Sequence, residues 1–385
     1  MRASKRQRKR ASVTDIGGKS AKVVAGVIAG LALAGLLTPS LAGAADTQPI
    51  AIVIHGGAGV INRAEMTPER ERQYKIGLEA ARDAGYAVLE RGGSALDAVT
   101  AAVHTMEDDP LFNAGKGAVL NHLGIAELDS SIMDGKTLRA GAVAGVQHVK
   151  NPVELARAVM EKSPHVMIAG TGAEEFAMEQ GLTMVPNSYF RTEPRVRALE
   201  KALKATPTAD SDSAGDPSRS NLHAAEAAGA TPAVASVTPL SDPFDDAKGT
   251  VGAVALDRNG NLAAATSTGG MTNKRPGRIG DSPLIGAGTY ANNASCAVSA
   301  TGDGEFFIRA VVAHDICALV EYKRLPLDAA AREVIHTKIE SMHATGGVIA
   351  LDPSGHIVMD FNSQGMFRAS RDSQGRRDVA IYGDR

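Results

Sequence analysis

The chain has 385 residues, of which 44% are hydrophobic and 22% charged, and these proportions are typical of a globular protein with a sizeable core. Of its 41 basic and 43 acidic residues, residues 46–385 carry 33 and 42, which is a balance of −9. An acidic chain binds a phosphate backbone poorly, so nucleic acid is not expected as a partner.

The first 45 residues have the pattern of a secretory signal peptide. Eight basic side chains precede an uncharged, largely apolar run at residues 23–37, which is shorter than the roughly 20 residues that span a bilayer. Ala42, Gly43 and Ala44 then form a small-x-small cleavage pattern, with residues 43–45 as the alternative register. We expect cleavage near Ala44 or Ala45 and a periplasmic or secreted protein, rather than an uncleaved anchor.

The mature chain begins with a predicted strand and two predicted helices. Residues 50–54 are a short apolar run that enters a glycine-rich stretch, HGGAG at residues 55–59, which predicts a buried strand followed by a tight turn. His55 is as compatible with packing as with catalysis. Thr67 caps a helix predicted to end at residue 89 or 90, and Ser94 opens a second helix that ends near Glu107.

A loop rich in acids and glycine follows at residues 106–117. Its oxygens could hold a hard cation, although solvated loop charge explains the same spacing. Asn113 stands out as a polar residue between Phe112 and small residues. Farther on, strands are predicted at residues 127–135 and 140–146, a helix at 152–162 and a short strand at 165–169.

Residues 205–247 are rich in Ala, Pro, Ser, Thr, Asp and Gly, and this composition predicts disorder. A linker between domains would look the same, but the residue that opens the next strand is Thr250. If the bond after Gly249 were cut, Thr250 would gain an α-amino group with a reference pKa of about 7.7 to 8.0. Gly249 has no side chain to obstruct that rearrangement. One residue would then supply both a nucleophile and its base.

Residues 251–266 predict a β-hairpin with a turn at Asn259 and Gly260, and in-register pairing would bring the hydroxyls of residues 265–270 close to Thr250. Arg278 and Asp281 stand three positions apart, as a cation and an anion that could grip an amino acid.

A strand around Cys296 leads to Thr301, where a hydroxyl and exposed glycine N–H groups suit an oxyanion site. Cys296 and Cys317 both lie in apolar segments, which favours buried free thiols over catalytic ones. A disulfide between them cannot be judged without geometry.

Five motifs together resemble the plant-type L-asparaginase and isoaspartyl peptidase family of N-terminal nucleophile hydrolases, and the resemblance runs from residue 55 to the C-terminus. They are LFNAG at 111–115, GTVGAVA at 249–255, ATSTGG at 265–270, GDSPLIGAGTYA at 280–291 and TGDGE at 301–305. The resemblance implies an α+β fold, a four-layer αββα sandwich. It also implies a precursor that cuts itself into an α subunit, residues 46–249, and a β subunit, residues 250–385, assembled as an (αβ)₂ heterotetramer.

The resemblance also implies roles for single residues. Thr250 would be the nucleophile, with Thr268 hydrogen-bonded near it and Thr301 and Gly302 forming the oxyanion hole. Asn113 would support processing. Substrate binding would fall to Arg278 for the α-carboxylate and to Asp281 with Gly304 for the α-amino group, with Gly302 as a further binding residue. No cofactor is implied for catalysis. A structural sodium ion would be held, mostly by backbone oxygens, at Met106, Glu107, Asp109, Phe112, Ala114 and Lys116.

The implied reaction is acyl transfer. Thr250 Oγ would attack the side-chain carbonyl of asparagine or a β-aspartyl dipeptide, and water would hydrolyse the resulting ester. Glycosylasparaginases, the nearest alternative, usually carry His-Asp before the threonine; here Lys248 and Gly249 stand there. A secreted binding protein that never matures is the alternative from another class. Against it stands the retained reactive set: Thr250, Thr268, Arg278, Asp281 and Thr301.

Overall fold

The computed structural model describes residues 48–59, 61, 63, 66–205 and 249–383. The predicted signal peptide and the low-complexity segment, apart from Ala205, lie outside these residues. None of the helices in the described part of the chain is long and apolar enough to cross a bilayer.

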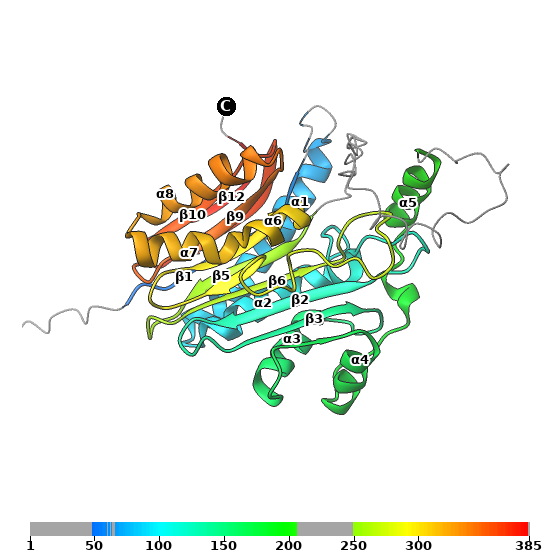
Figure 1. Cartoon of the computed structure of the whole chain (residues 1–385), viewed down its shortest axis with the longest axis horizontal. Helices are drawn as coiled ribbons and strands as arrows, with labels where there is room; N and C mark the ends of the chain where they lie inside the picture. The colour runs from blue at the N-terminus through cyan, green and yellow to red at the C-terminus, as the bar shows by residue number, and fades with distance from the viewer. Residues whose placement is uncertain (1–47, 60, 62, 64–65, 206–248, 384–385) are drawn as a thin grey trace, which may run out of the picture. The chain divides into compact units, whose positions relative to one another are not determined.

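An eight-stranded sheet forms one of the two central layers of the fold (Figure 1). Its strand order is β12-β11-β1-β5-β6-β2-β3-β4, and only the β3–β4 pair is parallel. Residues Val251–Leu256 (β5) therefore lie between Ala51–Gly59 (β1) and Leu262–Thr268 (β6). The other strands of this sheet are Leu128–Asp134 (β2), Ala140–Val146 (β3), Met167–Ala169 (β4), Gly365–Asp372 (β11) and Arg377–Tyr382 (β12).

A second, four-stranded sheet packs face to face on the first. It is antiparallel throughout, in the order β10-β9-β8-β7. Val53, Val254 and Leu256 of the large sheet meet Ile349 and Leu351 of the small sheet in a fully buried layer. The strands of the small sheet are Thr289–Ala291 (β7), Ala297–Gly302 (β8), Gly346–Leu351 (β9) and Ile357–Phe361 (β10).

Helices cover the outer face of each sheet. The large sheet is covered by Pro68–Glu90 (α1), Ala95–Asp108 (α2) and Pro152–Lys162 (α3). Helices α1 and α2 lie over β1, whereas α3 lies over β2 and β3. The small sheet is covered by Val312–Lys323 (α7), Leu327–Arg332 (α8) and the π-helical turn Glu333–Ile339 (η3). The layers therefore run helix, sheet, sheet, helix, which confirms the expected αββα sandwich. Shorter elements complete the chain: Gly115–Gly117 (η1), Gly170–Glu179 (α4), Asn187–Phe190 (η2), Glu193–Ala205 (α5) and Gly304–Ala310 (α6).

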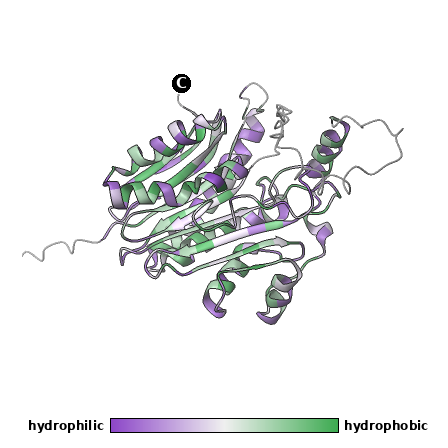
Figure 2. Cartoon of the chain, in the orientation of Figure 1, coloured by the Kyte–Doolittle hydropathy of each residue, from purple (hydrophilic) through white to green (hydrophobic). Residues whose placement is uncertain are grey.

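Strands of the central layers are apolar on both faces because both faces are covered. Along β1, Ala51 and Val53 point to the second sheet, whereas Ile52 and Ile54 point to the helices. In Figure 2 the strands are mainly green, while the helix ribbons also carry purple segments. This pattern explains why the sequence shows continuous apolar runs rather than a simple alternation.

The predicted helix boundaries agree closely with the structure. Thr67 Oγ1 accepts a hydrogen bond from Arg70 N at 3.2 Å and Ser94 Oγ accepts one from Asp97 N at 3.1 Å, so both caps form as expected. The predicted turn at residues 55–59 is wrong, because β1 continues to Gly59 through a bulge between His55 and Gly57. Pairing of residues 57–59 with β11 overrides the local turn preference of the glycines.

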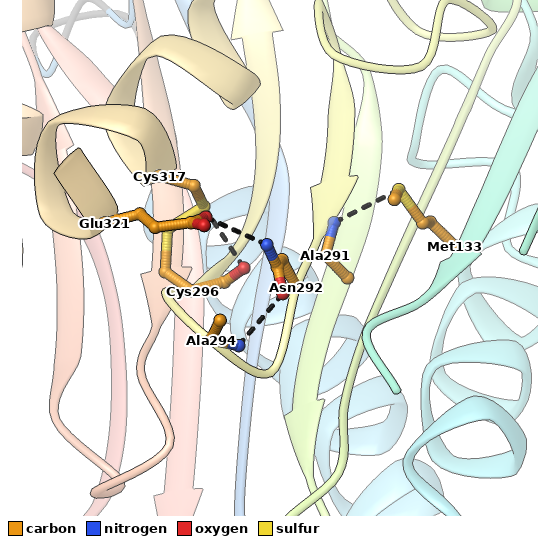
Figure 3. Close-up of a disulfide and its surroundings, with 7 residues drawn as sticks. All are labelled: Met133, Ala291, Asn292, Ala294, Cys296, Cys317 and Glu321. Carbon is orange, nitrogen blue, oxygen red and sulfur yellow. Dashed lines mark hydrogen bonds between the residues drawn. A yellow bond between two sulfur atoms is a disulfide. The ribbon is translucent and has the colours of Figure 1, made fainter. Parts of the chain in front are cut away.

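The expectation of free thiols is also wrong, because Cys296 and Cys317 form a disulfide (Figure 3). Cys296 directly precedes β8 and Cys317 lies in α7, and their Cα atoms are 5.3 Å apart. The bridge joins the small sheet to the helix that covers it. Apolar surroundings alone did not reveal this pairing, since it depends on a helix that packs back on its own strand.

Replacing both cysteines by alanine is expected to lower the free energy of unfolding by about 3 kcal/mol, because the bridge closes a loop with a sequence separation of 21. Thermal unfolding of the wild type and the double variant would measure this, each with and without reductant. Reductant should lower the Tm of the wild type only. Equal stability of the two oxidised proteins would contradict the prediction.

Candidate active site

Thr250 lies directly before β5, near the middle of the large sheet. In the β5–β6 hairpin Val251 pairs with Ser267, so the next position outward sets Thr250 beside Thr268. The two hydroxyls are hydrogen-bonded at 3.2 Å, as the in-register hairpin predicted. Thr268 Oγ1 also accepts a hydrogen bond from Gly270 N at 3.0 Å, which fixes its position. Thr250 itself is 8% exposed, so its hydroxyl lies at the floor of a depression rather than on open surface.

The second sheet reaches the backbone nitrogen of Thr250. Thr301 Oγ1, at the end of β8, accepts hydrogen bonds from Thr250 N at 3.4 Å and from Ala58 N at 3.3 Å. The adjoining Gly302 leaves no room for a side chain, since a Cβ there would lie 2.6 Å from the carbonyl oxygen of Thr345. The candidate site is therefore built where the ends of β1, β5 and β8 meet.

Ser282 of the GDSP motif also contacts the nucleophile, although no role was predicted for it. Its Oγ is 3.3 Å from Thr250 Oγ1, and the side chain is 1% exposed. Ser131 Oγ of β2 donates to the Ser282 carbonyl at 2.6 Å and holds this segment in place. The position next to Asp281 in the GDSP motif was the available signal, but the contact depends on how a long loop returns to β5.

The bond between Gly249 and Thr250 lies between the β1 bulge at Gly57 and the side chain of Asn113. A Cβ on Gly57, at φ +114°, would lie 2.7 Å from Gly249 Cα, so the bulge of β1 passes directly beside this bond. Asn113 supports the turn on the other side: its Nδ2 donates to Gly270 O at 2.8 Å and its Oδ1 accepts from Val119 N at 2.9 Å. Asn113 thus lies behind Thr268 rather than at the open surface.

A pocket opens over Thr250 and brings most of the predicted site residues together. Gly304 is central to it, because a Cβ there would be 3.0 Å from both Arg278 Nη2 and Asp281 Oδ1. The glycine therefore keeps open the space between a cation and an anion. The pocket is lined by Gly249, Thr250, Thr268, Gly270, Met271, Arg278, Gly280, Asp281, Ser282, Gly302, Asp303, Gly304 and Glu305.

Burial and ion pairing change the protonation and the partners of the charged groups in this pocket. Burial raises the pKa of Asp281 to about 7, even though the Arg278 guanidinium opposes the shift. Asp281 Oδ2 has no hydrogen-bond partner among the described residues, which leaves an acceptor free for a ligand. Arg278 is bound by the carboxylate of Glu305 through Nε and Nη2, at 2.8 and 2.9 Å, a pair that the sequence reasoning did not foresee.

His55 is packed in the core. It is fully buried, its Nε2 lies 2.9 Å from Ser299 Oγ, and burial lowers its pKa to about 3. Its β5 neighbour Gly252 has no space for a Cβ, because Ser299 and the His55 ring fill that position. A neutral imidazole buried between two sheets is a weak base and has no access to substrate. Of the two roles left open for His55, packing and catalysis, the geometry therefore supports packing.

The loop predicted to bind sodium is tightly packed around two glycines. A Cβ on Gly115 would collide with Glu107 O, and a Cβ on Gly117 would collide with Phe112 O and lie 2.6 Å from Pro110 O. The Glu107 side chain turns the other way, since its Oε1 accepts hydrogen bonds from Val153 N at 3.0 Å and Ser267 Oγ at 2.6 Å. With this side chain engaged elsewhere, the sodium site stays a prediction that depends on the backbone carbonyls of the loop.

Glu107→Gln is expected to weaken the pH dependence of stability. Burial raises the pKa of the Glu107 carboxyl to about 8, so below pH 4.5 both the folded and unfolded chains hold the proton and the group adds no penalty. Between pH 4.5 and 8 only the unfolded chain releases it, which costs the fold about 1.4 kcal/mol per pH unit. Denaturant unfolding at pH 5 and pH 8 would measure this. The same loss in both proteins would disprove the assignment.

Comparison with known proteins agrees with this geometry. A family model described as Asparaginase matches residues 47–381. The isoaspartyl peptidase of Escherichia coli K12 is 51% identical over 318 residues, covering 83% of this chain and 91% of the relative. The isoaspartyl peptidase/L-asparaginase of Mus musculus is 40% identical over 332 residues, covering 86% of this chain and 90% of the relative.

Proposed function

The chain belongs to the asparaginase family of N-terminal nucleophile hydrolases, and on that basis we propose that it cuts itself before Thr250 and then hydrolyses β-aspartyl dipeptides and L-asparagine. One observation carries the assignment to this site. The Thr250 hydroxyl lies at the base of a pocket that also presents Arg278 and Asp281 around Gly304. A nucleophile thus faces a cation and an anion spaced for one amino acid.

Self-cleavage is the first step of the proposal. Thr250 Oγ attacks the Gly249 carbonyl, and the Gly249–Thr250 C–N bond breaks, which forms an ester and frees the Thr250 amine. Water then hydrolyses the ester to a Gly249 carboxylate and the Thr250 hydroxyl. The bond is supported from both sides, by the β1 bulge at Gly57 and by the turn that Asn113 holds. The new amine lies beside Thr301 Oγ1, the current partner of Thr250 N at 3.4 Å. It can then take the proton from the Thr250 hydroxyl.

Turnover uses the same hydroxyl. The substrate α-carboxylate binds Arg278, and its α-ammonium group binds the free acceptor of Asp281 near Gly302 and Gly304. Thr250 Oγ attacks the side-chain carbonyl, Thr301 and the backbone at Gly302 stabilise the oxyanion, and ammonia or an amino acid leaves. Thr268 orients the nucleophile, because its hydroxyl lies 3.2 Å from that of Thr250. Water hydrolyses the β-aspartyl ester in the last step.

Three further features belong to the proposal. The backbone carbonyls of the 106–116 loop hold a sodium ion that stabilises the site. The residues that supply them are Met106, Glu107, Asp109, Phe112, Ala114 and Lys116. Elemental analysis of dialysed protein would detect the ion. The protein is exported, and the Cys296–Cys317 disulfide supports this because such bonds persist in oxidising compartments. Two processed chains assemble as an (αβ)₂ unit, whose mass light scattering would give.

The intact mass of the purified protein under denaturing conditions tests the proposal directly. Two fragments are expected: one starts at residue 45 or 46 and ends at Gly249, and the other runs from Thr250 to the C-terminus. Their masses would report export processing and self-cleavage independently. A single chain that persists after long incubation would favour the secreted binding protein, since Thr250 would then lack its free amine.

A further inference from the structure

Arg278 already has a carboxylate partner within the chain. A guanidinium offers two edges that each present a parallel pair of N–H donors, one at Nε and Nη2 and the other at Nη1 and Nη2. Glu305 occupies the first edge, with Nε–Oε1 at 2.8 Å and Nη2–Oε2 at 2.9 Å. The edge at Nη1 and Nη2 is not used by this pair.

The unused edge lies against the glycine wall of the pocket. A Cβ on Gly280 would be 3.0 Å from Nη1, and a Cβ on Gly304 would be 3.0 Å from Nη2 and from Asp281 Oδ1. Both glycines therefore leave open the space in front of this edge. A carboxylate that enters here meets Nη1 and Nη2 end-on while Asp281 lies next to it.

The Glu305 pair contributes little to holding the fold together. The Glu305 side chain is 56% exposed, whereas that of Arg278 is 19% exposed, so the pair lies at the pocket mouth. Exposed ion pairs add little to stability. Its effect is orientational, because a side-on carboxylate fixes the plane and direction of a long, otherwise mobile side chain.

We propose that Glu305 is a positioning residue that makes the enzyme selective for substrates with a free α-carboxylate. It holds Arg278 side-on, so that the end-on edge is preset toward the substrate and the ion pair survives binding. Without it, Arg278 must be ordered anew by each substrate, and affinity for the α-carboxylate falls. The inference rests on the proposed function, which assigns the α-carboxylate to Arg278.

The test compares two substrates that differ only in the group Arg278 would bind. L-Asparagine carries the α-carboxylate, and its α-amide carries a neutral carboxamide while keeping the ammonium and the scissile side chain. The measured quantity is the ratio of kcat/KM for asparagine to that for the amide. Wild type, Glu305→Gln, Glu305→Ala and Arg278→Gln would be assayed after mass analysis has shown full processing.

Glu305→Ala is expected to raise the KM for asparagine about tenfold, to change kcat less than threefold and to leave the amide unaffected. The ratio therefore falls about tenfold. Glu305→Gln, which keeps one acceptor for Arg278, should lie between wild type and alanine. Glu333→Gln, an exposed acid on η3, is the matched control and should behave like wild type.

The outcomes separate this inference from the proposed function. If Arg278→Gln leaves the ratio unchanged, the α-carboxylate does not bind Arg278 and the proposed site fails. If Arg278→Gln collapses the ratio but Glu305→Ala does not, only the role of Glu305 is overturned. A lower KM for asparagine in Glu305→Ala would overturn it as well, because Glu305 would then compete with the substrate. An equal loss on both substrates would indicate a merely structural role and would also overturn it.

Discussion

The Thr250→Ala variant is expected to remain a single chain and to lose turnover by roughly 10⁴-fold or more. Alanine removes the hydroxyl that lies 3.2 Å from Thr268 and 3.3 Å from Ser282, and with it the nucleophile for both self-cleavage and catalysis. Denaturing mass analysis would follow the cleavage, and release of ammonia from asparagine would follow turnover. Both losses should appear together, because one oxygen performs both steps.

Thr250→Ser is the matched control for this prediction. Serine keeps a hydroxyl and, after cleavage, an α-amine, so the chain should still divide and retain measurable activity. A Thr250→Ala chain that divides, or that turns over asparagine above a few per cent of wild type, would rule out Thr250 as the nucleophile. The error would then lie in the site and not in the family, which rests on similarity along the whole chain.

Gly304→Ala is expected to process normally and yet to lose about 100-fold or more in kcat/KM. The added methyl group would lie 3.0 Å from Arg278 Nη2, 3.0 Å from Asp281 Oδ1 and 3.1 Å from Gly280 Cα, in the space where a zwitterion would bind. A displacement of about 1 Å at a reacting group can cost 100-fold in rate. The Gly249–Thr250 bond does not depend on that space, so cleavage should be complete.

Gly57→Ala is the complementary variant to Gly304→Ala, because it should impair processing rather than substrate binding. Gly57 has a φ of +114°, and a methyl group added there would lie 2.7 Å from Gly249 Cα. The substitution would therefore disturb the bond that is cut rather than the substrate subsite. Processing should therefore slow in this variant while Gly304→Ala processes fully. If Gly304→Ala bound and hydrolysed asparagine as the wild type does, the substrate would have to lie elsewhere in the pocket.

Local sequence signals were sufficient for part of the fold and for the nucleophile's neighbourhood. The caps at Thr67 and Ser94 set the helix starts, and the register of the β5–β6 hairpin placed Thr268 beside Thr250. Each of these depends on residues within about 20 positions along the chain. The resemblance to a known family supplied the layers and the remaining roles.

What the sequence did not reveal depends on segments that meet only after folding. The β1 strand runs past its glycines because β11, over 300 residues later, pairs with it. Cys296 meets Cys317 because α7 packs back on β8, and Glu305 meets Arg278 because α6 begins beside the 275–282 loop. Ser282 contacts Thr250 through a similar long return. No local propensity encodes such contacts, so only tertiary packing reveals them.

The strand order has a consequence for the life of the enzyme after cleavage. In the large sheet, the β11–β12 and β5–β6 pairs come after residue 250, whereas β1 and the β2–β3–β4 group come before it, so groups of strands from the two pieces alternate. Once the chain is cut, neither piece holds the large sheet by itself, because β1 of the first piece is paired on both sides with strands of the second piece. Folding of the precursor is unimolecular, whereas reassembly of separated pieces must be bimolecular and dependent on concentration. Maturation therefore makes recovery from unfolding depend on protein concentration, so in dilute solution the lifetime of the mature enzyme depends on how slowly it unfolds.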